Sequence, residues 1–284
     1  MTVRHRRLSV GRLQLHVAEL GSGTPVLLLH GFPAHWADWR AQMEALAASG
    51  FRAIAPDLPG YGESDCLPRV SDYRSTLLAD DLAGLIRALG LERVHVLGHD
   101  WGGTLAYCLA TRHPQLVDRL IILNAGHPEL FRTALRRFSQ LRRSWYIFLF
   151  QLPFLSEWLV RRRAVIALCT RGMEVRAGAF SNGDIETLLQ SMRGRGVARA
   201  ALSYYRAALH SPIRAHGTLP HLTLVLWGER DGALSSTLLL DGLERLVPNV
   251  RVARFANAGH WLHRDLPEVV ARHVVQFLSA AADS

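Results

Sequence analysis

The sequence predicts an α/β fold in which helices cover both faces of a mostly parallel central sheet, with an all-helical insertion. Short, nearly continuous apolar runs are bounded by turn residues and alternate with segments of helical periodicity. Residues 127–216 break this alternation, because they show helical periodicity and no convincing strand. At 284 residues and 49% hydrophobic, the chain can bury a core of this size.

The predicted elements follow one another in a strand and helix order. An alternating segment, Leu13–Val17, comes first, and the short β-branched or leucine-rich runs are Val26–His30, Arg52–Ala55, Val94–Leu97, Leu120–Leu123, Leu222–Trp227 and Val250–Phe255. Helical patterns occupy Ala37–Ser49, Ser75–Leu89, Trp101–Arg112 and Pro267–Ser279. We therefore expect a core domain of residues 1–126 and 217–284. A helical cap of residues 127–216 is expected over the carboxyl edge of the sheet, where open α/β sheets bind ligands.

The positive charge of the chain is concentrated in the predicted cap. All 33 basic residues are arginine, which excludes a Schiff-base or phosphate-loop lysine. The cap holds 15 arginines against 5 acidic residues. Such a segment can attract nucleic acid, an anionic membrane surface or a carboxylate-bearing substrate, although a solvated arginine-rich surface is the simpler interpretation. We expect no nucleic-acid partner and leave a weak membrane-surface contact open.

Targeting and metal-binding signals are lacking in the sequence. The most apolar stretch, Trp145–Val160, is interrupted by polar residues and proline, so it does not resemble a membrane span. The arginine-rich start leads into a strand without an apolar leader segment, which favours a cytoplasmic protein. Cys66, Cys108 and Cys169 fit reduced, structural cysteines. No histidine and carboxylate cluster suggests a metal, and no cofactor is expected.

Asp100 stands where a serine hydrolase would carry its nucleophile. The strand Val94–Leu97 leads into Gly98, His99, Asp100, Trp101 and Gly102, and a helix follows. This strand, glycine turn and helix have the spacing of a nucleophile elbow. A carboxylate at this position attacks carbon and leaves an ester, so the substrate class should differ from that of a serine enzyme.

Three further groups would complete such a site. Asp231 and His260 follow later strands in the order nucleophile, acid, histidine, and the pair can activate water against the ester. The backbone N–H groups of Phe32 and Trp101 are candidate oxyanion donors. Proline after Phe32 favours a special backbone geometry there, with a cis peptide as one option.

Four sequence motifs resemble those of one known enzyme family. They are HGFPAHWADWR (His30–Arg40), DLPGYGESD (Asp57–Asp65), GHDWGG (Gly98–Gly103) and GHWLHRDLP (Gly259–Pro267). Together they resemble the epoxide hydrolase branch of the α/β-hydrolases over nearly the whole core and less clearly in the cap. The resemblance implies that Asp100 attacks an epoxide carbon, that His260 with Asp231 activates water, and that Tyr205 donates to the ring oxygen.

The second ring-opening tyrosine of that family is not matched. Leu149 stands where the family pattern places it, and Tyr146 lies one helical turn earlier. Tyr146 is a candidate second donor, with an interfacial cap residue as the alternative. The predicted pocket lining is Phe32, Trp36, Trp101, Leu149 and Trp261. Because Trp145–Val160 is apolar and flanked by arginines, the expected substrate is a lipophilic epoxide.

Two other functions stay open at this stage. Haloalkane dehalogenases resemble this chain in the nucleophile, acid and histidine, but many place asparagine where Phe32 stands. Trp145 or Trp158 could then supply the missing halide donor. Tyr205 favours an epoxide. A ligand-binding protein without turnover is the second alternative, and the complete set of Asp100, Asp231 and His260 argues against it. The sequence does not specify an oligomeric state.

Overall fold

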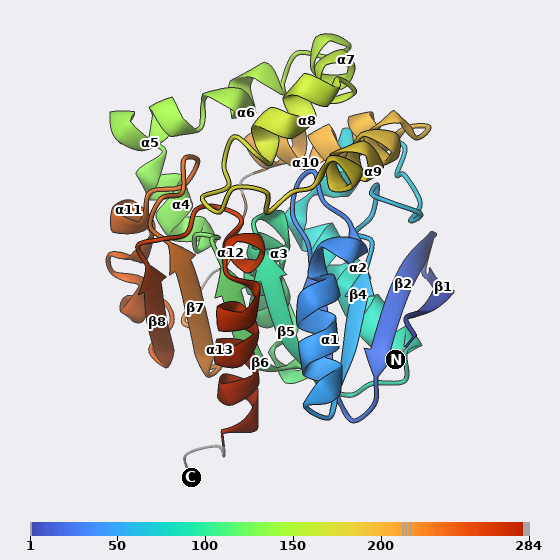
Figure 1. The fold of residues 1–284 in the computed structure, drawn as a ribbon, viewed down its shortest axis with the longest axis vertical. Helices are drawn as coiled ribbons and strands as arrows, with labels where there is room; N and C mark the ends of the chain where they lie inside the picture. The colour runs from blue at the N-terminus through green and yellow to red at the C-terminus, as the bar shows by residue number, and fades with distance from the viewer. Residues whose placement is uncertain (1, 212, 214, 216, 281–284) are drawn as a thin grey trace.

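A single eight-stranded sheet organises the computed structural model, which describes residues 2–211, 213, 215 and 217–280 (Figure 1). The strand order is β1-β2-β4-β3-β5-β6-β7-β8. The strands are β1 (Arg4–Val10), β2 (Leu13–Gly21), β3 (Thr24–Leu29), β4 (Phe51–Pro56), β5 (Val94–His99), β6 (Val117–Leu123), β7 (Thr223–Gly228) and β8 (Val250–Phe255). All pairings from β4 to β8 are parallel, so the predicted α/β fold class is confirmed.

Of the two strands at the antiparallel end of the sheet, the sequence predicts β2 but not β1. β1 pairs with β2, and β2 pairs with β4, both antiparallel. Leu15 and Val17 of β2 are buried, whereas most residues of β1 are exposed. An edge strand that buries few side chains carries no apolar pattern, which explains why the arginine-rich Arg4–Val10 was not recognised as a strand.

Helices cover both faces of the sheet. α1 (Arg40–Ala48) and α13 (Pro267–Ser279) pack together on the face nearer the viewer in Figure 1, and α2 (Ser75–Ala88) and α3 (Trp101–Arg112) cover the other face. Strand β3 illustrates why its sequence is continuously apolar. Leu27 and Leu29 belong to one buried cluster and Val26 and Leu28 to the other, because successive side chains point to opposite faces.

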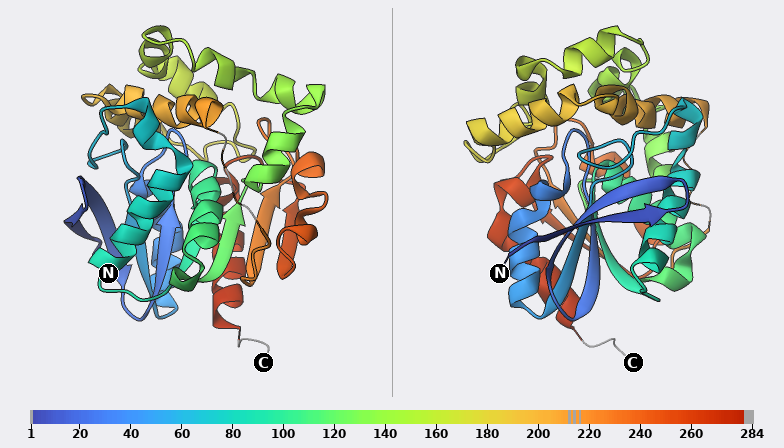
Figure 2. Two further views of the ribbon diagram at one scale, coloured as in Figure 1. Left: turned by 180° about the vertical axis from the view of Figure 1, so that it is seen from behind. Right: turned by 90° about the vertical axis from the view of Figure 1, so that its right-hand side faces the viewer.

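A layer of helices between β6 and β7 lies over the carboxyl edge of the sheet in all views of Figures 1 and 2. It comprises α4 (Pro128–Ala134), α5 (Phe138–Arg143), α6 (Trp145–Leu149), α7 (Leu155–Val160), α8 (Arg163–Cys169), α9 (Asn182–Arg193) and α10 (Val197–His210). We call α4–α10 the cap. The predicted domain boundary at residue 216 lies outside the described residues.

The remaining elements are short. They are η1 (Trp36–Trp39), η2 (Val70–Tyr73), η3 (Pro114–Leu116), α11 (Ser236–Leu240), η4 (Leu243–Arg245) and α12 (Leu262–Asp265). Within the described part of the chain, no helix has the length and apolar character needed to cross a membrane.

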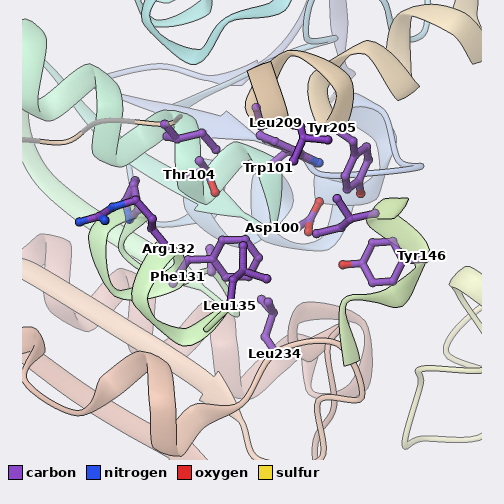
Figure 3. Close-up of a pocket in the computed structure, with 16 residues that line it drawn as sticks. Asp100, Trp101, Thr104, Phe131, Arg132, Leu135, Tyr146, Tyr205, Leu209 and Leu234 are labelled. Carbon is purple, nitrogen blue, oxygen red and sulfur yellow. The ribbon is translucent and has the colours of Figure 1, made fainter. Parts of the chain in front are cut away.

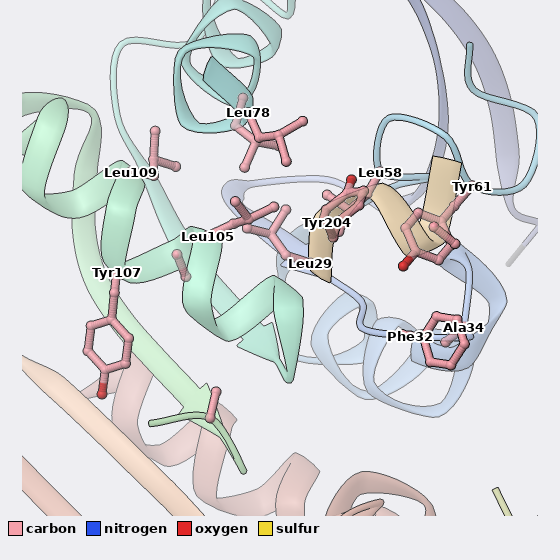
Figure 4. Close-up of a cluster of buried hydrophobic side chains, with 14 of the residues drawn as sticks. Leu29, Phe32, Ala34, Leu58, Tyr61, Leu78, Leu105, Tyr107, Leu109 and Tyr204 are labelled. Atoms are coloured by element: carbon pink, nitrogen blue, oxygen red, sulfur yellow. The ribbon is translucent and has the colours of Figure 1, made fainter. Parts of the chain in front are cut away.

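The cap is joined to the core by buried aromatic packing and by hydrogen bonds. Tyr204 of α10 inserts into the apolar cluster around Leu58 and Tyr61 (Figure 4), and its hydroxyl donates to the Pro59 carbonyl at 2.8 Å. Trp261 of the core donates its indole N–H to the Cys169 carbonyl of α8 at 2.9 Å. These contacts fix the inner face of the cap relative to the sheet edge.

Candidate active site

Asp100 sits on a tight turn between β5 and α3. Its φ of +53° lies in the left-handed region that few non-glycine residues adopt. A Cβ on Gly98 would lie 2.5 Å from the Gly102 carbonyl oxygen, and one on Gly102 would collide with the Leu29 backbone. Only glycine at these two positions lets the strand and helix approach so closely. The turn therefore forces the Asp100 carboxylate out of the sheet edge.

Two backbone N–H groups hold the Asp100 carboxylate. The Phe32 N–H donates to Oδ1 at 2.9 Å, and the Trp101 N–H is a second donor. The Phe32–Pro33 peptide bond is cis, as the sequence suggested. His30 stabilises the adjacent turns, since its ring contacts the Gly31 carbonyl and accepts from the Leu58 N–H at 3.0 Å. Burial raises the pKa of Asp100, while nearby His260 and the two N–H donors favour the carboxylate.

His260 and Asp231 form a hydrogen-bonded pair beside this carboxylate. His260 Nδ1 lies 2.9 Å from Asp231 Oδ2, and Nε2 lies 3.7 Å from Asp100 Oδ2. Burial opposes the charge on His260, but the carboxylates of Asp231 and Asp100 outweigh burial and raise its pKa to about 9. Asp231 is buried too, yet His260 and several hydrogen-bond donors lower its pKa. The pair is thus an imidazolium and a carboxylate at neutral pH.

Asn124 is a component of the site that the sequence analysis missed. It follows β6 with a φ of +39°, and its side-chain amide donates to Asp231 Oδ2 at 2.8 Å. Its Oδ1 also accepts from the Gly228 N–H at 3.0 Å, so it ties the end of β6 to the end of β7. The other oxygen of Asp231 accepts from the N–H groups of Ala233 and Leu234. The sequence signal for Asn124 is its position, because a polar residue directly after a buried strand lies at the carboxyl edge of the sheet.

The sequence shows no histidine and carboxylate cluster that suggests a metal, but the fold brings such a group together behind His260. Potential ligand atoms of Asp38, His99 and His263 lie within 4.8 Å of one another. However, the Asp38 carboxylate already binds His263 Nε2 at 2.6 Å and Arg264 Nε at 2.7 Å. His99 Nε2 contacts the His260 carbonyl at 2.9 Å. The cluster therefore braces the loop of His260 through internal hydrogen bonds. Sequence spacing concealed it because Asp38 lies far from the two histidines along the chain.

A cavity of about 280 Å³ opens between the core and the cap, with Asp100 on its wall (Figure 3). Its lining is mainly apolar and comes from α3, α4, α6, α10 and nearby loops. The lining residues include Trp101, Thr104, Phe131, Leu135, Ile147, Ala208, Leu209 and Leu234. Such a cavity suits a lipophilic ligand whose reactive group meets a few polar side chains.

Tyr205 and Tyr146 both line this cavity. Figure 3 shows their rings on the side of the cavity next to Asp100, with the hydroxyl groups directed inward. The Tyr205 ring packs edge-on against Trp101, with the ring centroids 5.0 Å apart, and the two tyrosine rings lie 6.0 Å apart. Burial and the Asp100 carboxylate raise the pKa of both tyrosines, so each hydroxyl remains protonated.

Of the five predicted pocket residues, only Trp101 is among the residues that line this cavity. The Phe32 ring packs behind Tyr205, at 5.7 Å between centroids. Leu149 ends α6 and is half-buried, because Tyr146 and Ile147 form the cavity wall on that helix. Trp36 packs against His5, and Trp261 is fully buried against His99 and Phe180. Large aromatic side chains fill cores more often than pockets.

Comparison with known proteins agrees with this architecture. A family model described as the alpha/beta hydrolase fold matches residues 24–265. A relative named "Epoxide hydrolase 3" from Xenopus tropicalis is 38% identical over 261 residues, which cover 89% of this chain and 71% of the relative. "AB hydrolase superfamily protein YfhM" of Bacillus subtilis is 33% identical over 94% of each chain.

A solved structure is similar over almost the entire chain. The Bacillus megaterium epoxide hydrolase in complex with an inhibitor superposes with a TM-score of 0.89 at 28% identity, covering 97% of this chain and all of the other. The fold and the elbow thus define an α/β-hydrolase. Within that superfamily, the chain belongs to the epoxide hydrolase family.

Proposed function

We propose that this protein hydrates a lipophilic epoxide to a vicinal diol through a covalent ester on Asp100. One observation carries the proposal: a carboxylate paired with His260 and Asp231 lines the same cavity as two tyrosines. Asp100, His260 and Asp231 can form and hydrolyse an alkyl ester. The two tyrosine hydroxyls can donate a hydrogen bond to the leaving oxygen. Residues 127–216 act as a cap domain on a core of residues 1–126 and 217–284.

Ring opening uses groups from both the core and the cap. A carboxylate oxygen of Asp100 attacks one epoxide carbon, and the bond from that carbon to the ring oxygen breaks. Tyr205, with Tyr146 as the second donor, hydrogen-bonds the ring oxygen and supplies its proton as the alkoxide develops. The raised pKa of both phenols keeps these protons in place until the oxygen becomes strongly basic.

Ester hydrolysis uses the core alone. His260 takes a proton from water, and the hydroxide attacks the carboxyl carbon of the Asp100 ester. The N–H groups of Phe32 and Trp101 stabilise the tetrahedral oxyanion. The bond between that carbon and the alkoxy oxygen then breaks, and the leaving alkoxide takes the proton of the new carboxylic acid. The diol leaves, and Asp100 is again a carboxylate with one oxygen from water. Because the Asp100 charge helps to raise the pKa of His260, forming the ester lowers that pKa, so His260 returns its proton to the phenolate left by ring opening and becomes the neutral base.

The positions of Trp145 and Trp158, and Phe32 itself, argue against halide release as the main activity. Trp145 and Trp158, the candidate second halide donors, are 57% and 52% exposed and are not among the residues that line the cavity. Phe32 contributes an apolar ring in place of an amide. A halide would therefore find the Trp101 indole as a donor without the second one that the alternative requires.

A single-turnover experiment in heavy-oxygen water tests this function. Enzyme in excess converts a neutral aryl epoxide. The masses of the peptides that contain Asp100 and of the diol are then measured by mass spectrometry. We expect label in the Asp100 carboxyl group and none in the first diol, because water attacks the carboxyl carbon. Label in the diol with none on Asp100 would contradict the covalent route. A chloroalkane of similar size serves as the control, and halide release from it would favour the dehalogenase alternative. Binding without turnover of either compound would favour a binding protein.

A further inference from the structure

The outward face of α5, α6 and α7 exposes an unusual amount of apolar surface. Nine of the eleven exposed large apolar side chains in the described part of the chain lie between residues 138 and 168. Each of the three helices presents a pair spaced by three residues, which places both members on one face. These pairs are Phe138 with Leu141, Trp145 with Phe148, and Leu155 with Trp158. We call these six residues, with Leu152 and Phe154, the outer cap surface.

The outer cap surface occupies one end of the molecule. Figures 1 and 2 show α5–α7 in the layer of the cap that lies farthest from the C-terminus. Phe154, at the start of α7, is 85% exposed and has a φ of +64°. A bulky residue rarely adopts this conformation, and it does so only where the surrounding structure imposes it. The backbone at this position therefore holds a phenylalanine out in solvent.

The segment that carries these apolar residues is rich in arginine and nearly free of acidic residues. Residues 130–168 contain eight arginines and one acidic residue, Glu157. Glu157 faces inward and pairs with Arg206 at 2.7 Å. Among described residues, Arg136, Arg137 and Arg142 have no acidic partner, and the Arg162 guanidinium stacks over the Trp158 ring at 4.1 Å. The outer cap surface is therefore both apolar and strongly cationic.

We propose that the outer cap surface docks onto the headgroup layer of an anionic bilayer. Arginine, tryptophan and phenylalanine on one face are the composition that binds such an interface. A second copy of the chain is a poorer partner, because a two-fold contact would bring the same arginines face to face. The absence of a spanning helix in the described residues agrees with a peripheral contact.

Helix α6 links this surface to the cavity. Trp145 and Phe148 point to solvent, whereas Tyr146 and Ile147 of the same helix line the cavity. If the protein has the function proposed above, a lipophilic epoxide dissolved in the bilayer would reach Asp100 past a helix already lying on the lipid. The cap would then take substrate from the membrane and not from bulk water.

Vesicle co-sedimentation of the intact protein tests the docking without substrate. We expect binding to vesicles of phosphatidylcholine with phosphatidylglycerol, little binding to phosphatidylcholine alone, and loss of binding as salt rises. The double variant Arg136→Glu with Arg142→Glu should weaken binding roughly tenfold or more, given the attraction of each basic residue to such a surface. Phe154→Ser with Trp158→Ser should also weaken it.

Matched controls lie elsewhere on the surface. Val252→Ser on β8 removes an exposed apolar side chain, and Arg87→Glu on α2 reverses an exposed charge. Both should bind like the unaltered protein. Equal binding by the outer cap variants and the controls would overturn the proposal, and so would no binding to anionic vesicles. A dimer that the outer cap variants convert to a monomer would also overturn it, in favour of self-association.

Activity on a water-dissolved epoxide separates the two proposals. The outer cap variants should retain kcat/KM without vesicles, because their side chains do not line the cavity. They should lose rate only on an epoxide carried in anionic vesicles. Vesicle binding without any epoxide turnover would contradict the proposed function and leave the docking intact. Turnover that is equal for all variants in vesicles would contradict substrate capture from the membrane.

Discussion

The core and the cap contribute to the candidate site in different ways. Asp100, Asp231 and His260 of the core follow β5, β7 and β8, and backbone or side-chain hydrogen bonds fix each of them. Tyr205 and Tyr146 of the cap lie on helices and are positioned mainly by aromatic packing. The core thus holds the reacting groups with directional bonds, whereas the cap presents its donors through packing. Losing a core group should stop a chemical step, and losing a cap donor should slow one.

The largest expected effect comes from removing the core base. His260→Gln should leave ester formation possible but reduce steady-state turnover by roughly a thousandfold or more, as for other members of catalytic triads. Mass spectrometry of the protein after mixing with an aryl epoxide should show an adduct on Asp100. His221→Gln, which alters a histidine bonded to the Pro114 carbonyl, is the matched control. Rapid turnover by His260→Gln without adduct would remove His260 from the hydrolytic step.

Removal of the cap donors should have a smaller and graded effect. Tyr205→Phe or Tyr146→Phe should each slow ester formation by about 10–100-fold, because the other phenol still donates to the ring oxygen. Ester hydrolysis should be nearly unchanged. Tyr204→Phe is the control, since Tyr204 neighbours Tyr205 but donates to the Pro59 carbonyl. Rapid-quench kinetics separate the two steps, and equal slowing of both would contradict a donor role.

The smallest effect concerns pH and should be confined to the core. Ester hydrolysis needs neutral His260, whose pKa is about 9 while Asp100 is charged and lower once Asp100 is esterified. The rate of ester hydrolysis should therefore rise with pH by up to about tenfold per pH unit and level off below pH 9.

Tyr146→Phe should keep this pH profile, because the cap donor acts in the other step. Single-turnover decay of the ester across pH measures the profile. A rate that falls as pH rises from neutrality would mean that the protonated imidazole is the active form. Such a result would contradict the role of neutral His260 as the base that hydrolyses the ester.

The fold and the order of core groups could be read from local sequence. The inner strands of the parallel sheet are buried on both faces, so runs of apolar residues identified β3 to β7, whereas exposed β1 gave no such signal. Asp100, Asp231 and His260 each follow a strand, and the carboxyl ends of parallel strands meet at one edge. Their proximity at 2.9 and 3.7 Å follows from that topology.

The cavity lining and the supporting polar groups could not be read in the same way. Trp36, Trp261 and Leu149 have the residue types of a pocket, but neighbouring chain segments decide whether such a side chain lines a cavity, fills the core or covers a surface. Asn124 and Asp38 work through partners distant in sequence. No periodicity or motif records such pairings.

The sequence by itself determined the α/β fold class, the nucleophile elbow and the family, because these depend on strand periodicity and on glycines at fixed spacing around Asp100. Only the tertiary structure decided which tyrosines share a cavity with Asp100 and which cap side chains face solvent. The reason is that helix α6 has two faces whose roles depend on what packs against them. Tyr146 lines the cavity that Asp100 also lines, whereas Trp145 is 57% exposed.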